Sequence, residues 1–190
     1  MWNRTPFADE VRIDADGIRL VWHRECPESR YCGGNIPWSR VRDADPGASP
    51  PQLRLVDGRT VFISAEYQEE LAAAVSEARV PVVERYDVWG DLLQPFLDTD
   101  YDICREECEQ RLRSWGFSDH ETRRIRQRVR KRMLALTLIT WEWVSYGQSD
   151  LLLTTRHTPD PFYRRFRAWT DMIADRPYQR GGPSTVAPPG

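Results

Sequence analysis

The chain lacks an apolar run long enough to cross a membrane. Its longest apolar run, Met133 to Val144, is interrupted by Glu142 and is shorter than the roughly 20 residues that a membrane-spanning helix needs. The chain also lacks the charged-then-apolar start of a signal peptide. We therefore expect a cytoplasmic protein that does not insert into a membrane.

Motifs of common catalytic sites are missing as well. There is no Gly-x-Ser-x-Gly elbow, no glycine-rich phosphate loop and no His-Glu-x-x-His zinc motif. Only three histidines are present, and His120 and His157 stand at positions typical of the surface. We therefore favour a protein that is not an enzyme, assign no catalytic residue and expect no cofactor.

Cysteine is scarce, and its four copies are Cys26, Cys32, Cys104 and Cys108. Because the chain is neither small nor visibly secreted, we expect reduced thiols. His23, Cys26 and Cys32 are the only candidate zinc ligands in one loop, but their spacing differs from that of tetrahedral zinc sites. We therefore predict no metal site.

An acidic stretch offers a calcium-binding alternative. Asp98, Asp100 and Asp102 have the spacing of an EF-hand loop, but Ile103 stands where the sharp turn needs glycine. The same acids also suit a helix N-terminus, where carboxylates interact favourably with the helix dipole. We favour this second explanation.

Charge is abundant but unevenly distributed along the chain. Residues 1–110 hold 12 Arg against 22 Asp and Glu, a net charge of −10. Residues 111–190 hold 15 Arg and Lys against 7 Asp and Glu, a net charge of +8. Such a split indicates either an anionic partner or two halves that neutralise each other.

The basic residues are densest between positions 123 and 132, where seven of ten are cationic. The predicted helix that carries them begins at Ser118, with Glu121 completing a capping box, and runs to about Tyr146. These residues form a candidate binding face for phosphates or acidic groups: Arg123, Arg124, Arg126, Arg128, Arg130, Lys131 and Arg132. Alternatively, an antiparallel acidic helix would place residues 106–109 against residues 124–128, and the resulting ion pairs would occupy this face. We favour this second explanation.

The first 80 residues show the pattern of a small antiparallel sheet. Two pairs of short alternating segments each flank an Asp-Gly turn, which predicts two hairpins. From Tyr67 to Ala78 the apolar period changes to that of a helix. The predicted strands are Val11–Ile13, Ile18–Leu20, Leu53–Leu55 and Val61–Ile63.

Between the hairpins lies the sequence Ile36-Pro37-Trp38-Ser39-Arg40-Val41. With the hairpins and the following helix, it resembles bacterial pleckstrin-homology-like domains, whose strands carry an Ile-x-Trp-x-x-Val pattern. The resemblance covers about Val11 to Ala78 and implies an open barrel of seven strands that a terminal helix plugs. It also implies a binding surface and carries over no catalytic residue.

The rest of the chain reads as helices, at about 87–96, 101–115, 118–146 and 161–174. Glu142 stands alone among apolar residues, and with Trp141, Trp143 and Tyr146 it forms a candidate pocket. We therefore predict an α+β protein with a β-rich domain at 1–80 that resembles pleckstrin-homology-like domains, a helical domain at 81–177 and a disordered tail at 178–190.

These observations favour a binding or adaptor protein that contacts a macromolecule through its segregated acidic and basic surfaces. We expect a protein partner, with nucleic acid at the arginine-rich helix as the alternative. A small-molecule or enzymatic site around Glu142 is a further alternative. Homo-oligomerisation through the oppositely charged halves stays open.

Overall fold

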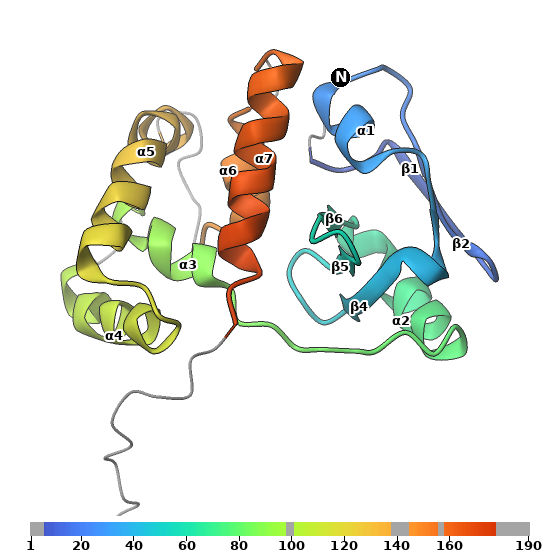
Figure 1. Cartoon of the computed structure of the whole chain (residues 1–190), viewed down its shortest axis with the longest axis horizontal. Helices are drawn as coiled ribbons and strands as arrows, with labels where there is room; N and C mark the ends of the chain where they lie inside the picture. Colours follow the sequence, from blue (N-terminus) through green and yellow to red (C-terminus); the bar gives the residue numbers. More distant parts are fainter. Residues whose placement is uncertain (1–5, 98–100, 138–144, 156–157, 178–190) are drawn as a thin grey trace, which may run out of the picture. The chain divides into compact units, whose positions relative to one another are not determined.

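The structure is a computed structural model that describes residues 6–97, 101–137, 145–155 and 158–177, and only the backbone of residues 101–104. It is a mixed α+β protein that divides into two compact units. Unit 1 comprises Met1–Tyr86 and Gln148–Ala174, and unit 2 comprises Asp87–Gly147 and Asp175–Gly190. The chain therefore leaves unit 1 for unit 2 and returns before its last long helix (Figure 1).

Unit 1 contains two three-stranded antiparallel sheets, ordered β1-β2-β3 and β4-β5-β6. Each sheet contains one predicted hairpin, and both hairpins form where the Asp-Gly turns were expected. Gly17 ends the first turn, where an added Cβ would lie 2.3 Å from the carbonyl oxygen of Ile36, so the close approach of β3 requires glycine. The strands are β1 (Glu10–Asp14), β2 (Gly17–Val21), β3 (Asn35–Pro37), β4 (Val41–Asp45), β5 (Gln52–Leu55) and β6 (Thr60–Phe62).

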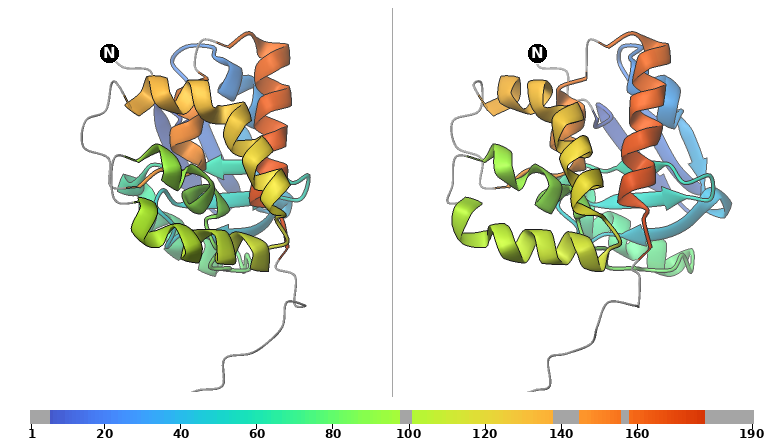
Figure 2. Two further views of the ribbon diagram at one scale, coloured as in Figure 1. Left: turned by 90° about the vertical axis from the view of Figure 1, so that its left-hand side faces the viewer. Right: turned by 60° about the vertical axis from the view of Figure 1, so that its left-hand side comes forward.

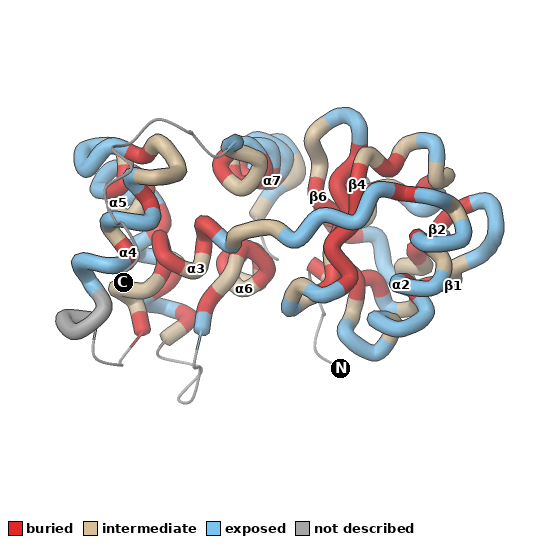
Figure 3. Tube along the Cα trace, turned by 90° about the horizontal axis from the view of Figure 1, so that it is seen from below, coloured by how far each residue is buried: buried red, intermediate tan, exposed pale blue. Residues whose placement is uncertain are grey.

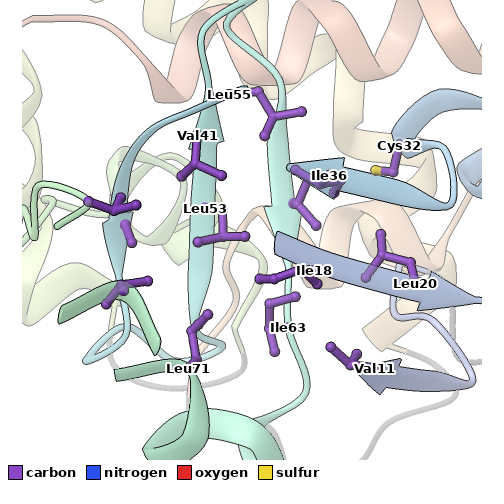
Figure 4. Close-up of a cluster of buried hydrophobic side chains, with 14 of the residues drawn as sticks. Val11, Ile18, Leu20, Cys32, Ile36, Val41, Leu53, Leu55, Ile63 and Leu71 are labelled. Carbon is purple, nitrogen blue, oxygen red and sulfur yellow. The ribbon is translucent and has the colours of Figure 1, made fainter. Parts of the chain in front are cut away.

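The core of unit 1 lies between these two sheets and helix α2 (Gln68–Glu77), which follows the 3-10 turn η2 (Ala65–Tyr67). Figure 4 shows apolar side chains converging from both sheets and from α2, where Leu71 is fully buried. Ile36 and Val41 of the Ile-x-Trp-x-x-Val pattern belong to this core. Trp38, in the 3-10 turn η1 (Trp38–Arg40), is half-buried at its edge.

Residues 23–51, between the two hairpins, are rich in proline and glycine and yet contain regular secondary structure. They contain helix α1 (Pro27–Cys32), strand β3 and strand β4. Cys26 caps α1, because its Sγ accepts a hydrogen bond from the Ser29 amide at 3.4 Å. A cysteine cap is not among the common cap residues, so the sequence pattern gave no sign of this helix.

Two helices near the end of the chain belong to unit 1, not to the helical unit. They are α6 (Gln148–Leu153) and α7 (Asp160–Ala174). The segment after α2 also stays with unit 1, because the amide of Ala44 in β4 bonds to the carbonyl of Pro81 at 2.9 Å. This division differs from the predicted domains at 1–80 and 81–177, while the predicted tail at 178–190 lies outside the described residues.

Unit 2 is helical and is built around the short helix α3 (Val88–Leu93), which continues into the 3-10 turn η3 (Gln94–Phe96). Helix α4 (Tyr101–Ser114) and helix α5 (Asp119–Thr137) both contact α3. The guanidinium of Arg111 in α4 donates to both carboxylate oxygens of Asp91 in α3, at 2.9 and 2.7 Å. This bidentate pair fixes α4 on α3.

The turn between α4 and α5 forms at Gly116, between the helices predicted at about 101–115 and 118–146. Gly116 has φ +76°, and the amides of Gly116 and Phe117 bond to the carbonyls of Arg113 and Leu112 at 2.9 and 3.0 Å. These are the two hydrogen bonds of a Schellman motif, in which glycine adopts the left-handed conformation without steric cost. After this turn α5 rises steeply away from α4, so the two helices do not lie antiparallel (Figure 2).

Candidate functional site

The basic residues singled out in the sequence all lie on α5, a helix of 19 residues. Its start is capped as predicted, because the amide of Glu121 donates to Ser118 Oγ at 3.2 Å. One stripe of α5 is buried in unit 2: Ile125, Val129, Met133 and Leu136. Burial of this stripe fixes which face of the helix remains exposed (Figure 3).

The face opposite this stripe is a cationic surface, which we call the basic face. It consists of the exposed side chains of Arg123, Arg124, Arg128, Arg130 and Lys131. Arg124, Arg130 and Lys131 form no ion pair with any residue that the structure describes. Positive charge is therefore presented along several turns of one helix.

The other two predicted residues, Arg126 and Arg132, flank the buried stripe. Arg126 donates to the carbonyl oxygens of Leu92 and Asp91, both at 3.2 Å, and therefore ties α5 to α3. Arg132 is half-buried, and its burial lowers the pKa of the guanidinium from the ordinary value. Both residues serve the packing of unit 2 more than its surface.

The predicted ion-pair seam between α4 and α5 forms in part. Across the two helices, Arg126 lies 3.7 Å from Glu109, a pair that falls within the predicted ranges 106–109 and 124–128, and Arg113 near the turn lies 2.9 Å from Asp119. Glu106 and Glu107 are exposed on α4. Figure 2 shows that α5 rises away from α4 at a steep angle, so the two helices do not follow each other along their whole length.

A C-terminal arginine supports the start of α5. Arg176 donates to Glu121 Oε1 at 2.5 Å and Oε2 at 3.0 Å, and its guanidinium lies 3.9 Å from the centre of the Phe117 ring. The hydrogen bonds from Arg176 hold the pKa of Glu121 below its ordinary value, although burial acts in the opposite direction. The segment after α7 is therefore fixed to the base of α5 within unit 2.

Unit 1 contains a second concentration of charge, which is buried and which the sequence analysis missed. Arg167 of α7 is fully buried, as is Glu28 of α1, and their closest side-chain atoms are 3.4 Å apart. Arg167 also pairs with Asp171 and donates to the carbonyl oxygen of Thr60 at 2.6 Å. We call these residues and their hydrogen-bonding neighbours the Arg167 network.

The neighbours satisfy the carboxylates of the Arg167 network. Tyr163 donates to Glu28 Oε2, and Cys32 Sγ donates to Glu28 Oε1 at 3.1 Å. Tyr31 donates to Asp171 Oδ2 at 2.9 Å, and Gln148 of α6 donates to Asp171 Oδ1 at 2.8 Å. The network therefore joins α1, β6, α6 and α7, which explains why the two late helices belong to unit 1.

Electrostatics and enclosure assign a structural role to the Arg167 network. Burial alone would lower the pKa of Arg167, but the nearby carboxylates of Asp171 and Glu28 raise it well above its ordinary value. Burial, followed by the charge of Glu28, raises the pKa of the Cys32 thiol. These shifts favour the charged form of Arg167 and the neutral form of Cys32, and both side chains are buried. Neither side chain is therefore suited to acid–base or nucleophilic catalysis.

The candidate zinc ligands His23, Cys26 and Cys32 form no metal site in the part of the chain that the structure describes. His23 is exposed, whereas Cys26 caps α1 and Cys32 bonds to Glu28. Across the described ranges, no group of three or more His, Cys, Asp or Glu side chains is arranged to hold a metal ion. The acidic stretch Asp98 to Asp102 lies outside the described side chains.

The predicted pocket around Glu142 falls largely on residues that the structure does not describe. Glu142, Trp141 and Trp143 lie within 138–144, outside the described residues. Tyr146 is described, and it is buried in unit 2 with its hydroxyl 3.4 Å from Thr137 Oγ1. The proposal of a site at Glu142 therefore stays a prediction.

No helix in the described part of the chain is both long enough and apolar enough to traverse a membrane. In comparisons with known proteins, the chain matches no family model, no curated protein and no solved structure.

Proposed function

We propose that this chain is a non-enzymatic binding protein that contacts an acidic surface of a partner protein through the basic face of α5. The observation that carries the proposal is the exposure of five cationic side chains on one helix, of which Arg124, Arg130 and Lys131 have no ion-pair partner in the described chain. Exposed guanidinium groups bind carboxylates in bidentate geometry. A partner that supplies carboxylates would therefore find these donors available.

Nucleic acid is the second candidate partner, and the same face supports it. The 19 residues of α5 span about 28 Å at 1.5 Å per residue, so its cations could meet several successive phosphates. The acidic residues of α4 count against this candidate, because Glu106 and Glu107 are exposed in the same unit. We therefore rank the acidic protein surface first.

We further propose a cytoplasmic location and a pleckstrin-homology-like architecture for the sheets of unit 1. Free thiols at Cys26, Cys32 and Cys108 are consistent with a reducing compartment. Two sheets followed by α2, which buries Leu71 and Val75, support the architecture. The six strands in the described part of the chain are one fewer than the seven that such a barrel needs.

Fluorescence anisotropy tests the proposed function with three labelled probes: a polyglutamate peptide, duplex DNA and single-stranded RNA. We expect saturable binding of polyglutamate that weakens as salt increases. The triple variant Arg124→Glu/Arg130→Glu/Lys131→Glu should weaken it at least tenfold. Helix propensity is nearly the same for Arg, Lys and Glu, so the variant should retain the helical circular dichroism of the native chain.

The matched control is Arg19→Glu/Arg24→Glu/Arg165→Glu, which makes the same change in net charge at exposed positions of unit 1. It should bind polyglutamate nearly as well as the native chain. Equal losses in the two triple variants would show that net charge, not the basic face, determines binding. Tighter binding of DNA or RNA, with a steep dependence on salt, would replace the first candidate by the second.

A further inference from the structure

A surface groove in unit 1 has the opposite charge to the basic face. It encloses about 470 Å³ between the β1–β2 turn, Trp38 and the outward side of α2. Its lining includes Ile13 and Asp14 of β1, Trp38 of η1, and Glu70, Ala74 and Glu77 of α2. Its volume lies within the range of small-ligand sites.

Local hydrogen bonds hold the walls of this groove in place. Trp38 Nε1 donates to the carbonyl oxygen of Asp14 at 3.1 Å, and the Trp38 amide donates to that of Asp16 at 3.1 Å. The Tyr67 hydroxyl accepts a hydrogen bond from the Val11 amide at 3.4 Å, which ties the base of α2 to β1. The groove is therefore preformed, and a ligand would not have to order it.

Three carboxylates and no cationic residue are among the described residues that line the groove. Glu70 and Glu77 are exposed and form no ion pair with any described residue. The Asp14 carboxylate is the third, and its Oδ1 accepts hydrogen bonds from the amides of Asp16 and Gly17, at 3.0 and 3.1 Å. These three negative charges favour a cation and disfavour an anion.

Apolar surface lies between the carboxylates. Ala73 and Ala74 stand between Glu70 and Glu77 on α2, so no long side chain from these positions covers the half-buried Trp38. An indole ring attracts a guanidinium placed over its face. The alanines supply an apolar floor for the methylene groups that precede such a cation.

We propose that this groove binds an arginine side chain presented by an extended segment of a partner protein. The guanidinium would stack on Trp38 and donate to Glu70 or Glu77, and its methylenes would lie on the alanines. Arginine fits better than lysine because a planar guanidinium both stacks and forms bidentate bonds with a carboxylate. The chain would then have two oppositely charged docking surfaces, one in each unit.

NMR spectroscopy of the full chain provides the test, because the Trp38 indole N–H is a reporter inside the groove. The probe is the capped peptide Gly-Arg-Gly-Arg-Gly, compared with its lysine and glutamine analogues. The Trp38 indole N–H resonance is assigned as the one that disappears from the spectrum of the Trp38→Phe variant. We expect this resonance to shift saturably as the arginine peptide is added. The arginine peptide should bind more tightly than the lysine peptide, and the glutamine peptide should cause no shift.

Two variants of α2 and one control complete the experiment. Glu70→Gln/Glu77→Gln should weaken binding of the arginine peptide at least tenfold. Ala73→Leu should weaken it similarly by filling the groove, at an exposed helical position where leucine is tolerated and with every charge retained. Glu69→Gln/Glu84→Gln, which removes the same charge at exposed positions outside the groove, should bind like the native chain.

The proposal is overturned if the indole resonance does not shift, if Ala73→Leu binds like the native chain, or if the lysine peptide binds as tightly as the arginine peptide. The result of this titration does not depend on whether the basic face binds an acidic partner. The Arg124→Glu/Arg130→Glu/Lys131→Glu variant changes unit 2 only and should leave the titration of Trp38 unaffected.

Discussion

The two units place arginine in opposite environments. In unit 1, Arg167 is fully enclosed, and two carboxylates and a backbone carbonyl surround its guanidinium. In unit 2, Arg124 and Arg130 are exposed and form no ion pair with described residues. A buried guanidinium is tolerated only where carboxylates compensate its charge and acceptors bind its N–H groups. Water alone solvates an exposed guanidinium.

This difference separates the arginines that build the fold from those available to a partner. Removing a satisfied cation from the interior leaves its carboxylates buried without compensation. Removing a solvated cation from α5 leaves nothing uncompensated. The comparison therefore predicts large effects on stability in unit 1 and effects on binding, with little loss of stability, on the basic face.

The largest effect is expected from Arg167→Met, which keeps the length of the side chain but removes its charge. Glu28 and Asp171 would then be buried without a cation, and we expect a loss of about 3–5 kcal/mol in the free energy of unfolding. Urea denaturation followed by circular dichroism measures it. Arg165→Met, two residues earlier and exposed, should cost no more than about 0.5 kcal/mol.

A triple variant tests whether the lost compensation is the cause. Arg167→Met/Glu28→Gln/Asp171→Asn removes the two negative charges together with the positive one. It should be more stable than Arg167→Met alone, because amides cost less to bury than unpaired carboxylates. If the triple variant were less stable than the single one, the loss would come from packing and not from charge.

A smaller effect separates two arginines on the same helix. Arg126→Gln removes the hydrogen bonds to the carbonyl oxygens of Leu92 and Asp91, and we expect it to destabilise the protein by about 1–2 kcal/mol. Arg124→Gln should change the free energy of unfolding by less than about 0.5 kcal/mol. Equal effects in urea denaturation would mean that Arg126 belongs to the basic face after all.

The parts of the fold that short-range patterns determine could be predicted from the sequence. Both Asp-Gly hairpins, the N-cap at Ser118 and the Schellman turn at Gly116 depend on residues that are neighbours in the chain. The mixed α+β class followed from the change in apolar period after residue 66. The exposed residues of the basic face could be named, although the steep angle between α4 and α5 could not be predicted.

The long-range features could not be predicted, and α7 shows why. The helical spacing of Phe162, Phe166, Trp169 and Ile173 predicts that these four residues form one buried stripe. Phe166 and Ile173 are indeed buried, but Phe162 is 63% exposed while Tyr163 and Arg167 are fully buried. A hydrophobic pattern cannot reveal a helix that buries a polar network, because the partners of Arg167 lie more than 100 positions away in the chain. The one local signal was the Arg167–Asp171 pair at the i, i+4 spacing of a helix.

The smallest predicted effect concerns the ion pair of Arg176 and Glu121. Its exposure lies between that of the buried Arg167 and that of the exposed arginines of the basic face. Arg176 holds the pKa of Glu121 below its ordinary value of 4.5, so the folded protein binds fewer protons at this site than the unfolded chain. The pair therefore adds stability above pH 4.5, and this contribution disappears as the pH falls through the lower pKa of the folded state. Because Glu121 is 38% exposed, solvent screening limits the contribution to about 1 kcal/mol or less.

Urea denaturation of Arg176→Gln across pH 3 to 7 measures this contribution. The variant should be less stable than the native chain at pH 7, and the two curves should converge as the pH falls below the ordinary pKa of Glu121. In a Glu121→Gln background, where the carboxylate is absent, Arg176→Gln should have an effect that does not vary with pH. A gap that persisted at pH 3 in the native background would assign the role of Arg176 to its stacking on Phe117.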